Sequence, residues 1–187
     1  MNGAEPESEI PAVRHARCYG GSMKKKNGFS LIELLIVVAI ILIIAAIAIP
    51  NLLRSRMAAN EASAVGSLRT VNTAEVTYSS TYPDCGFTAL TNLGGAGSGV
   101  GTTTAAGLID NVLAGGTKSG YSFGASASGG GSGTCGDGTG TPNTTYVSGG
   151  VPTTPGQTGQ RYFYSDQSGV IRYNQTGAAT NASPSLQ

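Results

Sequence analysis

The stretch FSLIELLIVVAIILIIAAIAI, residues 29–49, decides the fold of this chain. It contains 21 residues and a single charged side chain, Glu33. About 20 apolar helical residues, each rising about 1.5 Å, span the roughly 30 Å hydrocarbon core of a bilayer. We therefore predict that residues 29–49 form a helix that crosses a membrane.

The charged residues in and before this segment indicate its orientation in the membrane and show that one of them, Glu33, needs a partner. Lys24–Lys26 precede it, and positive charge stays on the cytoplasmic side, so we expect the N-terminus inside and most of the chain outside. Glu33 is unusual, because a carboxylate in hydrocarbon costs on the order of 2.5 to 3.5 kcal/mol and normally faces a partner. The alternative is that Glu33 reaches back to the lipid headgroups near the helix start.

The run KKKNGFSLIE, residues 24–33, closely resembles the cleavage and methylation segment of type IV prepilins and the related pseudopilins. A basic run, a glycine, a phenylalanine and a glutamate stand at the family's spacing and are followed by an apolar helix. The resemblance implies that prepilin peptidase cuts between Gly28 and Phe29 and methylates the new N-terminal Phe29. It also implies that Glu33 acts in assembly and that pilus assembly machinery is a partner.

Charge pairing gives a physical reason for the same arrangement. Cleavage would create an amine at Phe29, about one helical turn from the carboxylate of Glu33. When such helices bundle, the amine of one copy pairs with Glu33 of a neighbour, which removes an unpaired buried charge. We therefore expect the chain to form a homopolymer through its N-terminal helix.

Residues 1–28 are expected to be a leader peptide. Residues 1–22 show no periodicity, so they either belong to a long leader or reflect the choice of start site, with Met23 as the true start. Without the leader, the chain keeps six basic and seven acidic side chains, no histidine, and two cysteines, Cys85 and Cys135. The near-neutral charge predicts no nucleic-acid partner. The mature chain also lacks histidine, the residue most used in acid–base or metal chemistry.

Residues 50–83 are predicted to continue the helix beyond a kink at Pro50, with Pro83 ending it. Apolar side chains in this stretch recur at spacings of three, three, seven and four, which places them on one helix face. These side chains are Val65, Leu68, Val71, Tyr78 and Tyr82. The second half of the helix should therefore be amphipathic, whereas residues 29–49 are apolar all round.

Residues 84–187 are rich in Gly, Ser, Thr and Asn and are predicted to form a loop-rich β head. The expected elements are a helix at 105–113, strands at 120–125 and 144–148, and a hairpin of 161–165 and 170–174 around a turn at 166–169. The fold class is therefore α+β, with the long helix packed on a small antiparallel sheet of three or four strands. This arrangement and the head sequences are pilin-like.

Cys85 and Cys135 are predicted to form a disulfide. By the orientation argument they lie outside the membrane, where conditions are oxidising, and they are the two cysteines left after cleavage. A bridge closing about 50 residues stabilises a small head by roughly 4 kcal/mol in the chain-entropy model. A metal site or a reactive thiol would be the alternatives, but neither a histidine nor a second cysteine pair lies nearby.

No catalytic constellation stands out, so we predict no enzymatic activity, cofactor or metal. Asp137, in Cys-Gly-Asp-Gly, suits a turn better than a cation site, and Asp166 suits a turn better than a ligand. Asn143-Thr-Thr fits a glycosylation sequon. In a segment this rich in Asn, Ser and Thr, such a match also arises by chance.

The resemblance predicts a structural subunit of a type IV pilus-like surface filament, serving adhesion, twitching motility or DNA uptake. The precursor would sit in the bacterial inner membrane by a single span, with its N-terminus cytoplasmic. One alternative is a pseudopilin of a type II secretion system. A membrane-anchored binding module or a secreted enzyme is a more distant one.

Overall fold

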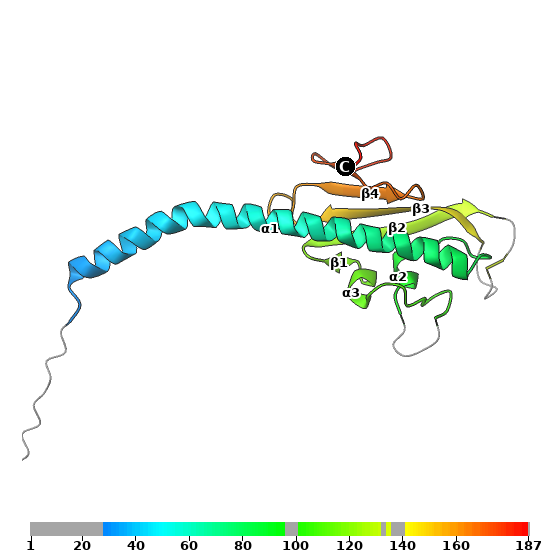
Figure 1. Ribbon diagram of the computed structural model, residues 1–187, viewed down its shortest axis with the longest axis horizontal. Helices are drawn as coiled ribbons and strands as arrows, with labels where there is room; N and C mark the ends of the chain where they lie inside the picture. Colours follow the sequence, from blue (N-terminus) through cyan, green and yellow to red (C-terminus); the bar gives the residue numbers. More distant parts are fainter. Residues whose placement is uncertain (1–27, 96–100, 132–133, 136–140, 187) are drawn as a thin grey trace, which may run out of the picture. The chain divides into compact units, whose positions relative to one another are not determined.

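The computed structural model describes residues 28–95, 101–131, 134–135 and 141–186. The expected leader up to residue 27 and Asp137 lie outside the described residues. The chain divides into two compact units, residues 1–42 and 43–187. The helices and strands, in chain order, are α1 (Leu31–Thr81), α2 (Leu90–Leu93), α3 (Asn111–Ala114), β1 (Thr117–Lys118), β2 (Tyr121–Gly130), β3 (Asn143–Pro152), β4 (Tyr162–Asp166) and β5 (Arg172–Asn174) (Figure 1).

Helix α1 changes character along its length. Pro50 lies inside the helix, and the large apolar side chains before Arg54 are exposed. From Ala64 onward one face is buried, and it carries the predicted stripe. Of that stripe, Val65, Leu68, Val71 and Tyr78 are buried, and Tyr82 packs against the core while partly exposed. The prediction of an amphipathic second half is therefore confirmed.

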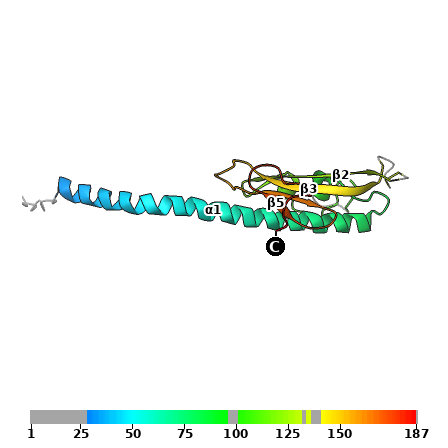
Figure 2. The ribbon, with the colours of Figure 1, turned by 90° about the horizontal axis from the view of Figure 1, so that it is seen from above.

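The head contains one antiparallel sheet in the order β1-β2-β3-β4-β5, so each strand lies beside its sequence neighbour. The two views show the second half of α1 lying along one face of this sheet (Figures 1 and 2). Side chains of α1, α2 and α3 meet those of the strands in a single apolar cluster that includes Leu68, Leu93, Leu113, Tyr121 and Phe163. The predicted α+β class is confirmed.

Two expectations about the head need correction. The helix predicted at 105–113 is wrong: α3 begins only at Asn111, because the carboxylate of Asp110 accepts the N–H of Leu113 and caps the helix there. The sheet has five strands rather than three or four, and β2 and β3 each contain ten residues instead of the five or six expected. The predicted hairpin is confirmed as β4 and β5.

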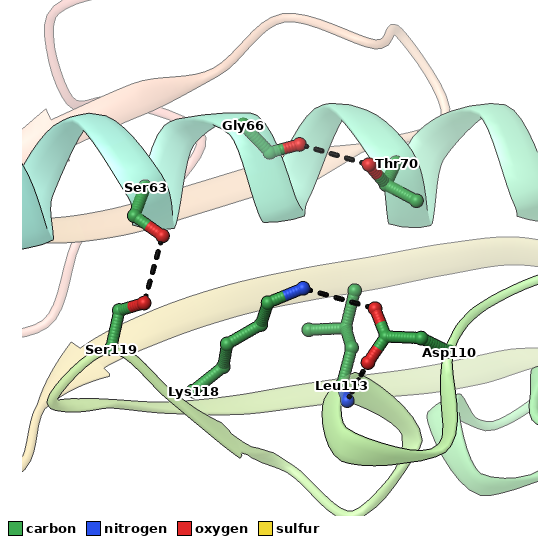
Figure 3. A network of polar contacts seen from close by, with 7 residues as sticks. All are labelled: Ser63, Gly66, Thr70, Asp110, Leu113, Lys118 and Ser119. Atoms are coloured by element: carbon green, nitrogen blue, oxygen red, sulfur yellow. Dashed lines mark hydrogen bonds and ion pairs between the residues drawn. The ribbon is translucent and has the colours of Figure 1, made fainter.

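The short edge strand β1 is fixed by polar contacts to its surroundings (Figure 3). Lys118 lies 3.0 Å from the Asp110 carboxylate that caps α3. The neighbouring Ser119 accepts a hydrogen bond from Ser63 of α1 at 2.9 Å. These contacts join β1 and the residue that follows it to α3 and α1.

A buried polar cluster lies between α1 and the sheet. The amide nitrogen of Asn72 donates to the hydroxyl of Ser165 at 2.8 Å. The amide oxygen of Asn72 accepts from the hydroxyls of Tyr146, at 3.2 Å, and Ser148, at 3.3 Å. All four side chains are buried. Asn72 therefore joins α1 to both β3 and β4.

The structure also joins Cys85 to Cys135 in a disulfide with a sequence separation of 50 residues. Cys85 is buried in the apolar cluster, and Cys135 packs against it. The bridge ties the chain that leaves α1 to the segment between β2 and β3.

We predict that Asn72→Ala lowers the free energy of unfolding by about 2 to 4 kcal/mol. The change leaves more than one buried hydroxyl without its partner, and each such loss costs roughly 1 to 3 kcal/mol. Urea unfolding of the full chain in detergent micelles, followed by near-ultraviolet circular dichroism, measures the effect. Thr73→Ala is the control, because Thr73 is exposed and its hydrogen bonds to described residues lie within its own helix. Equal losses in the two variants would contradict the role given to Asn72.

Candidate functional site

The candidate site is the chain segment that leads into α1. Gly28, Phe29 and Ser30 precede the helix, and all three are exposed. The Phe29 side chain is 84% exposed. A peptidase needs such a non-helical, accessible peptide bond, and the bond between Gly28 and Phe29 meets this requirement.

Gly28 has no packing reason to be a glycine. A Cβ atom built on Gly28 meets no described atom within 4 Å. The space around this residue therefore permits larger side chains. Any requirement for glycine would come from an enzyme that reads the segment.

Glu33 has a local role that the spacing argument missed. Its carboxylate accepts the backbone N–H of Ser30 at 2.9 Å, while the carbonyl of Ser30 accepts the N–H of Leu34. Ser30 and Glu33 are thus placed as the first and fourth residues of a capping box, and the Glu33 carboxylate satisfies a donor at the helix start. The sequence signal was present as Ser-x-x-Glu. Because the side chain of Glu33 is exposed and this bond uses only one of its oxygens, the carboxylate keeps acceptor capacity for a further donor.

The helix that follows presents an apolar surface on every side. From Leu31 to Leu53 its large apolar side chains are between 45% and 79% exposed. Among the described residues, α1 is the one helix long and apolar enough to cross a membrane by length and composition. Leaving this much apolar surface in water is unfavourable, at about 25 cal/mol for each Å². The segment therefore needs lipid or other apolar helices around it.

The comparisons with known proteins concern this same region. The family model of the prokaryotic N-terminal methylation motif matches residues 23–49. The resemblance to type IV pilins is confirmed. A similar protein is the type IV wide pilus major component PilA4 of Thermus thermophilus, 62% identical over 39 residues.

The extent of this pilin-type similarity is limited. The PilA4 match covers 21% of this chain and 30% of the relative. No solved structure matches the chain. The similarity therefore rests on the methylation motif and a short aligned segment. What is said of the head rests on the structure of this chain alone.

The other residues singled out in the sequence lie in the head. The structure bonds Cys85 to Cys135, and Asp166 accepts from the backbone and hydroxyl of Ser168, as a turn residue does. The amide of Asn143, the first residue of the sequon, donates to the carbonyl of Phe87. Within the described ranges, no three His, Cys, Asp or Glu side chains gather where they would hold a metal.

We predict that Gly28→Val reduces cleavage at residue 28 by about tenfold or more, equivalent to about 1.4 kcal/mol. The structure leaves room for valine, so the loss would arise in the peptidase and not in the fold. Intact mass of the protein from membranes measures the ratio of precursor to mature chain. Gly66→Val is the matched control, because a Cβ there also meets nothing within 4 Å. Normal processing of Gly28→Val would exclude the assigned cleavage position.

Proposed function

We propose that this chain is the precursor of a structural subunit that polymerises into a type IV pilus-like filament, and that it is not an enzyme. The observation that carries the proposal is the match to the methylation motif at residues 23–49, which includes an accessible Gly28–Phe29 bond directly before the apolar helix. The pilus component similar to this chain supports the same class. The precursor would be anchored in the bacterial inner membrane, with Lys24–Lys26 on the cytoplasmic side.

In the proposed sequence of events, prepilin peptidase cuts the Gly28–Phe29 bond and methylates the amine of Phe29. The apolar helix then leaves lipid and packs against the same helix of other copies, with the pilus assembly machinery moving the subunit. Both surroundings cover the side chains from Leu31 to Leu53 that are exposed in the single chain. Transfer between them therefore requires no refolding of the head.

Glu33 would direct the register of this packing. Its carboxylate pairs with the Phe29 amine of a neighbouring copy, so that neither charge is left alone in an apolar bundle. The bond to the Ser30 N–H uses one carboxylate oxygen and leaves the other for this amine. Capping and pairing are thus compatible, and a suitable substitution separates them.

We predict that Glu33→Gln lowers the amount of filament by about tenfold or more, while membrane insertion is unchanged. Glutamine still accepts the Ser30 N–H, so the cap remains, but the charge that pairs with the amine is gone. The amount of filament recovered by shearing measures assembly. Helix content by circular dichroism measures whether the cap remains. Glu33→Ala, which loses both roles, is the comparison. Normal assembly of Glu33→Gln together with failure of Glu33→Ala would assign the function to the cap instead.

The experiment that tests the proposed function is intact mass and N-terminal sequencing of the protein from sheared surface material and from membranes. We expect the sheared chain to begin at methylated Phe29 and to be two hydrogens lighter than its reduced form. The same processed chain found in membranes alone would indicate a pseudopilin of a secretion system. An unprocessed chain in both fractions would indicate a simple membrane-anchored module and overturn the proposal.

A further inference from the structure

Glu75 of α1 is a carboxyl group that none of the preceding functions uses. Its side chain is 0% exposed and lies on the helix face that packs against the head. One carboxyl oxygen, Oε2, accepts the backbone N–H of Thr88 at 3.1 Å. The other, Oε1, is buried and has no hydrogen-bond partner among the described residues. A buried carboxylate without a cation is strongly unfavourable, so such a group is either neutral or opens to water.

Within the described part of the chain, the groups around Glu75 supply no positive charge. Tyr146 of β3 faces it, and Tyr78 lies one turn further along the same buried helix face. The Cys85–Cys135 disulfide, in the segment that follows α1, does not titrate. Among the described ion pairs, none includes Glu75. An ionised Glu75 would therefore have the single N–H of Thr88 as its compensation.

Thr88 begins a short segment, Thr88–Leu93, that we call the latch segment. The Thr88 hydroxyl accepts from the Asn92 amide at 2.9 Å, and α2 occupies the end of the segment with Leu90 and Leu93 buried. On its N-terminal side the chain is fixed to β3, since Phe87 donates to and accepts from Asn143. The bond from Thr88 to Glu75 is thus the described hydrogen bond that holds the latch segment to α1.

We propose that Glu75 is a proton-operated latch: as a neutral carboxyl it keeps the latch segment on α1, and loss of its proton releases that segment. Release exposes the carboxylate to water without unfolding the sheet. On the N-terminal side the Asn143 contacts and the disulfide stay closed, so the opening begins after Phe87. Opening breaks the bonds that the carbonyls of Asn92 and Leu93 accept from Ala106, Leu108 and Ile109, and it exposes Leu90 and Leu93. Local opening of this kind costs less free energy than global unfolding.

The direction of the pH dependence follows from the pKa. Burial raises the pKa of Glu75 to about 7, and the Thr88 N–H only partly opposes this. In the open segment the carboxyl returns to its ordinary value of 4.5. Between these values the closed form holds more protons than the open form, so rising pH favours opening. The open population should rise by up to about tenfold per pH unit from about pH 5 to about pH 7, and then level off.

Hydrogen exchange of the full chain in detergent micelles, followed by mass spectrometry, tests the latch. After correction for the intrinsic pH dependence of exchange, protection of the Thr88–Leu93 peptide should fall by about tenfold or more between pH 5 and pH 7. Peptides from β2 and β3 should remain more strongly protected throughout. Equal protection of all these peptides would mean that the segment opens only with the whole head, and would overturn the proposal.

Glu75→Gln should remove the pH dependence, because glutamine still accepts the Thr88 N–H but has no proton to lose. Glu61→Gln is the matched control: Glu61 lies on the same helix and accepts the backbone N–H of Gln160. This control should keep the wild-type pH dependence. The same fall in protection in Glu75→Gln as in the wild type would assign the effect to another group.

A second measurement on the wild-type chain does not depend on any variant folding. Infrared titration in heavy water should show one protonated carboxyl band that persists above pH 6 and disappears around pH 7. Exposed carboxyl groups are ionised well below this range. Loss of the last protonated carboxyl band by pH 5 would show that Glu75 is already ionised in the closed head and would overturn the latch.

Discussion

Helix α1 must be covered by different surroundings in its two halves, and the rest of the structure depends on this constraint. Before Arg54 the helix shows large apolar side chains on all faces, which only lipid or other apolar helices satisfy. After Ala64 it shows one buried stripe, which the sheet, α2 and α3 of the same chain satisfy. The second half of α1 is therefore covered by the chain's own head, whereas its first half needs lipid or other helices to cover it.

The parts of the fold that the sequence predicted are those set by apolar patterns. The apolar half of α1, the stripe from Val65 to Tyr82 and the β4–β5 hairpin all have strong local signals, and the structure forms each of them where its signal lies. The length of β2 and β3 was missed because Gly and Ser occupy much of both strands, and these residues favour turns when read locally. Their pairing over nine positions is a long-range effect that overrides local preference.

The site was predicted less completely than the fold. Motif spacing proposes Gly28, Phe29 and Glu33, and their roles stay predictions. The cap formed by Glu33 and Ser30 was not predicted, although Ser-x-x-Glu is a local signal for it. Asn72 and Glu75 were missed for a different reason. A polar residue within an amphipathic helix is normally assigned to the solvent face, but helical spacing places both side chains within the apolar stripe. Asn72 follows Leu68 by four residues and Glu75 follows Val71 by four, whereas the exposed Thr73 lies off the stripe.

The buried polar groups follow from how little apolar volume the head contains. Much of β2 and β3 consists of Gly, Ser and Thr, so α1 packs against a few aromatic side chains of the strands, and specific hydrogen bonds and a covalent bridge also hold the elements together. Asn72 fits this scheme fully, because both its donor and its acceptor have partners in the sheet. The buried Glu75 is compatible with the closed head only while its carboxyl is protonated. A group of that kind makes the stability of the contact it supports depend on pH, whereas an amide in its place would not. The carboxyl at position 75 thus gives the head a titratable contact at the point where the chain leaves its long helix.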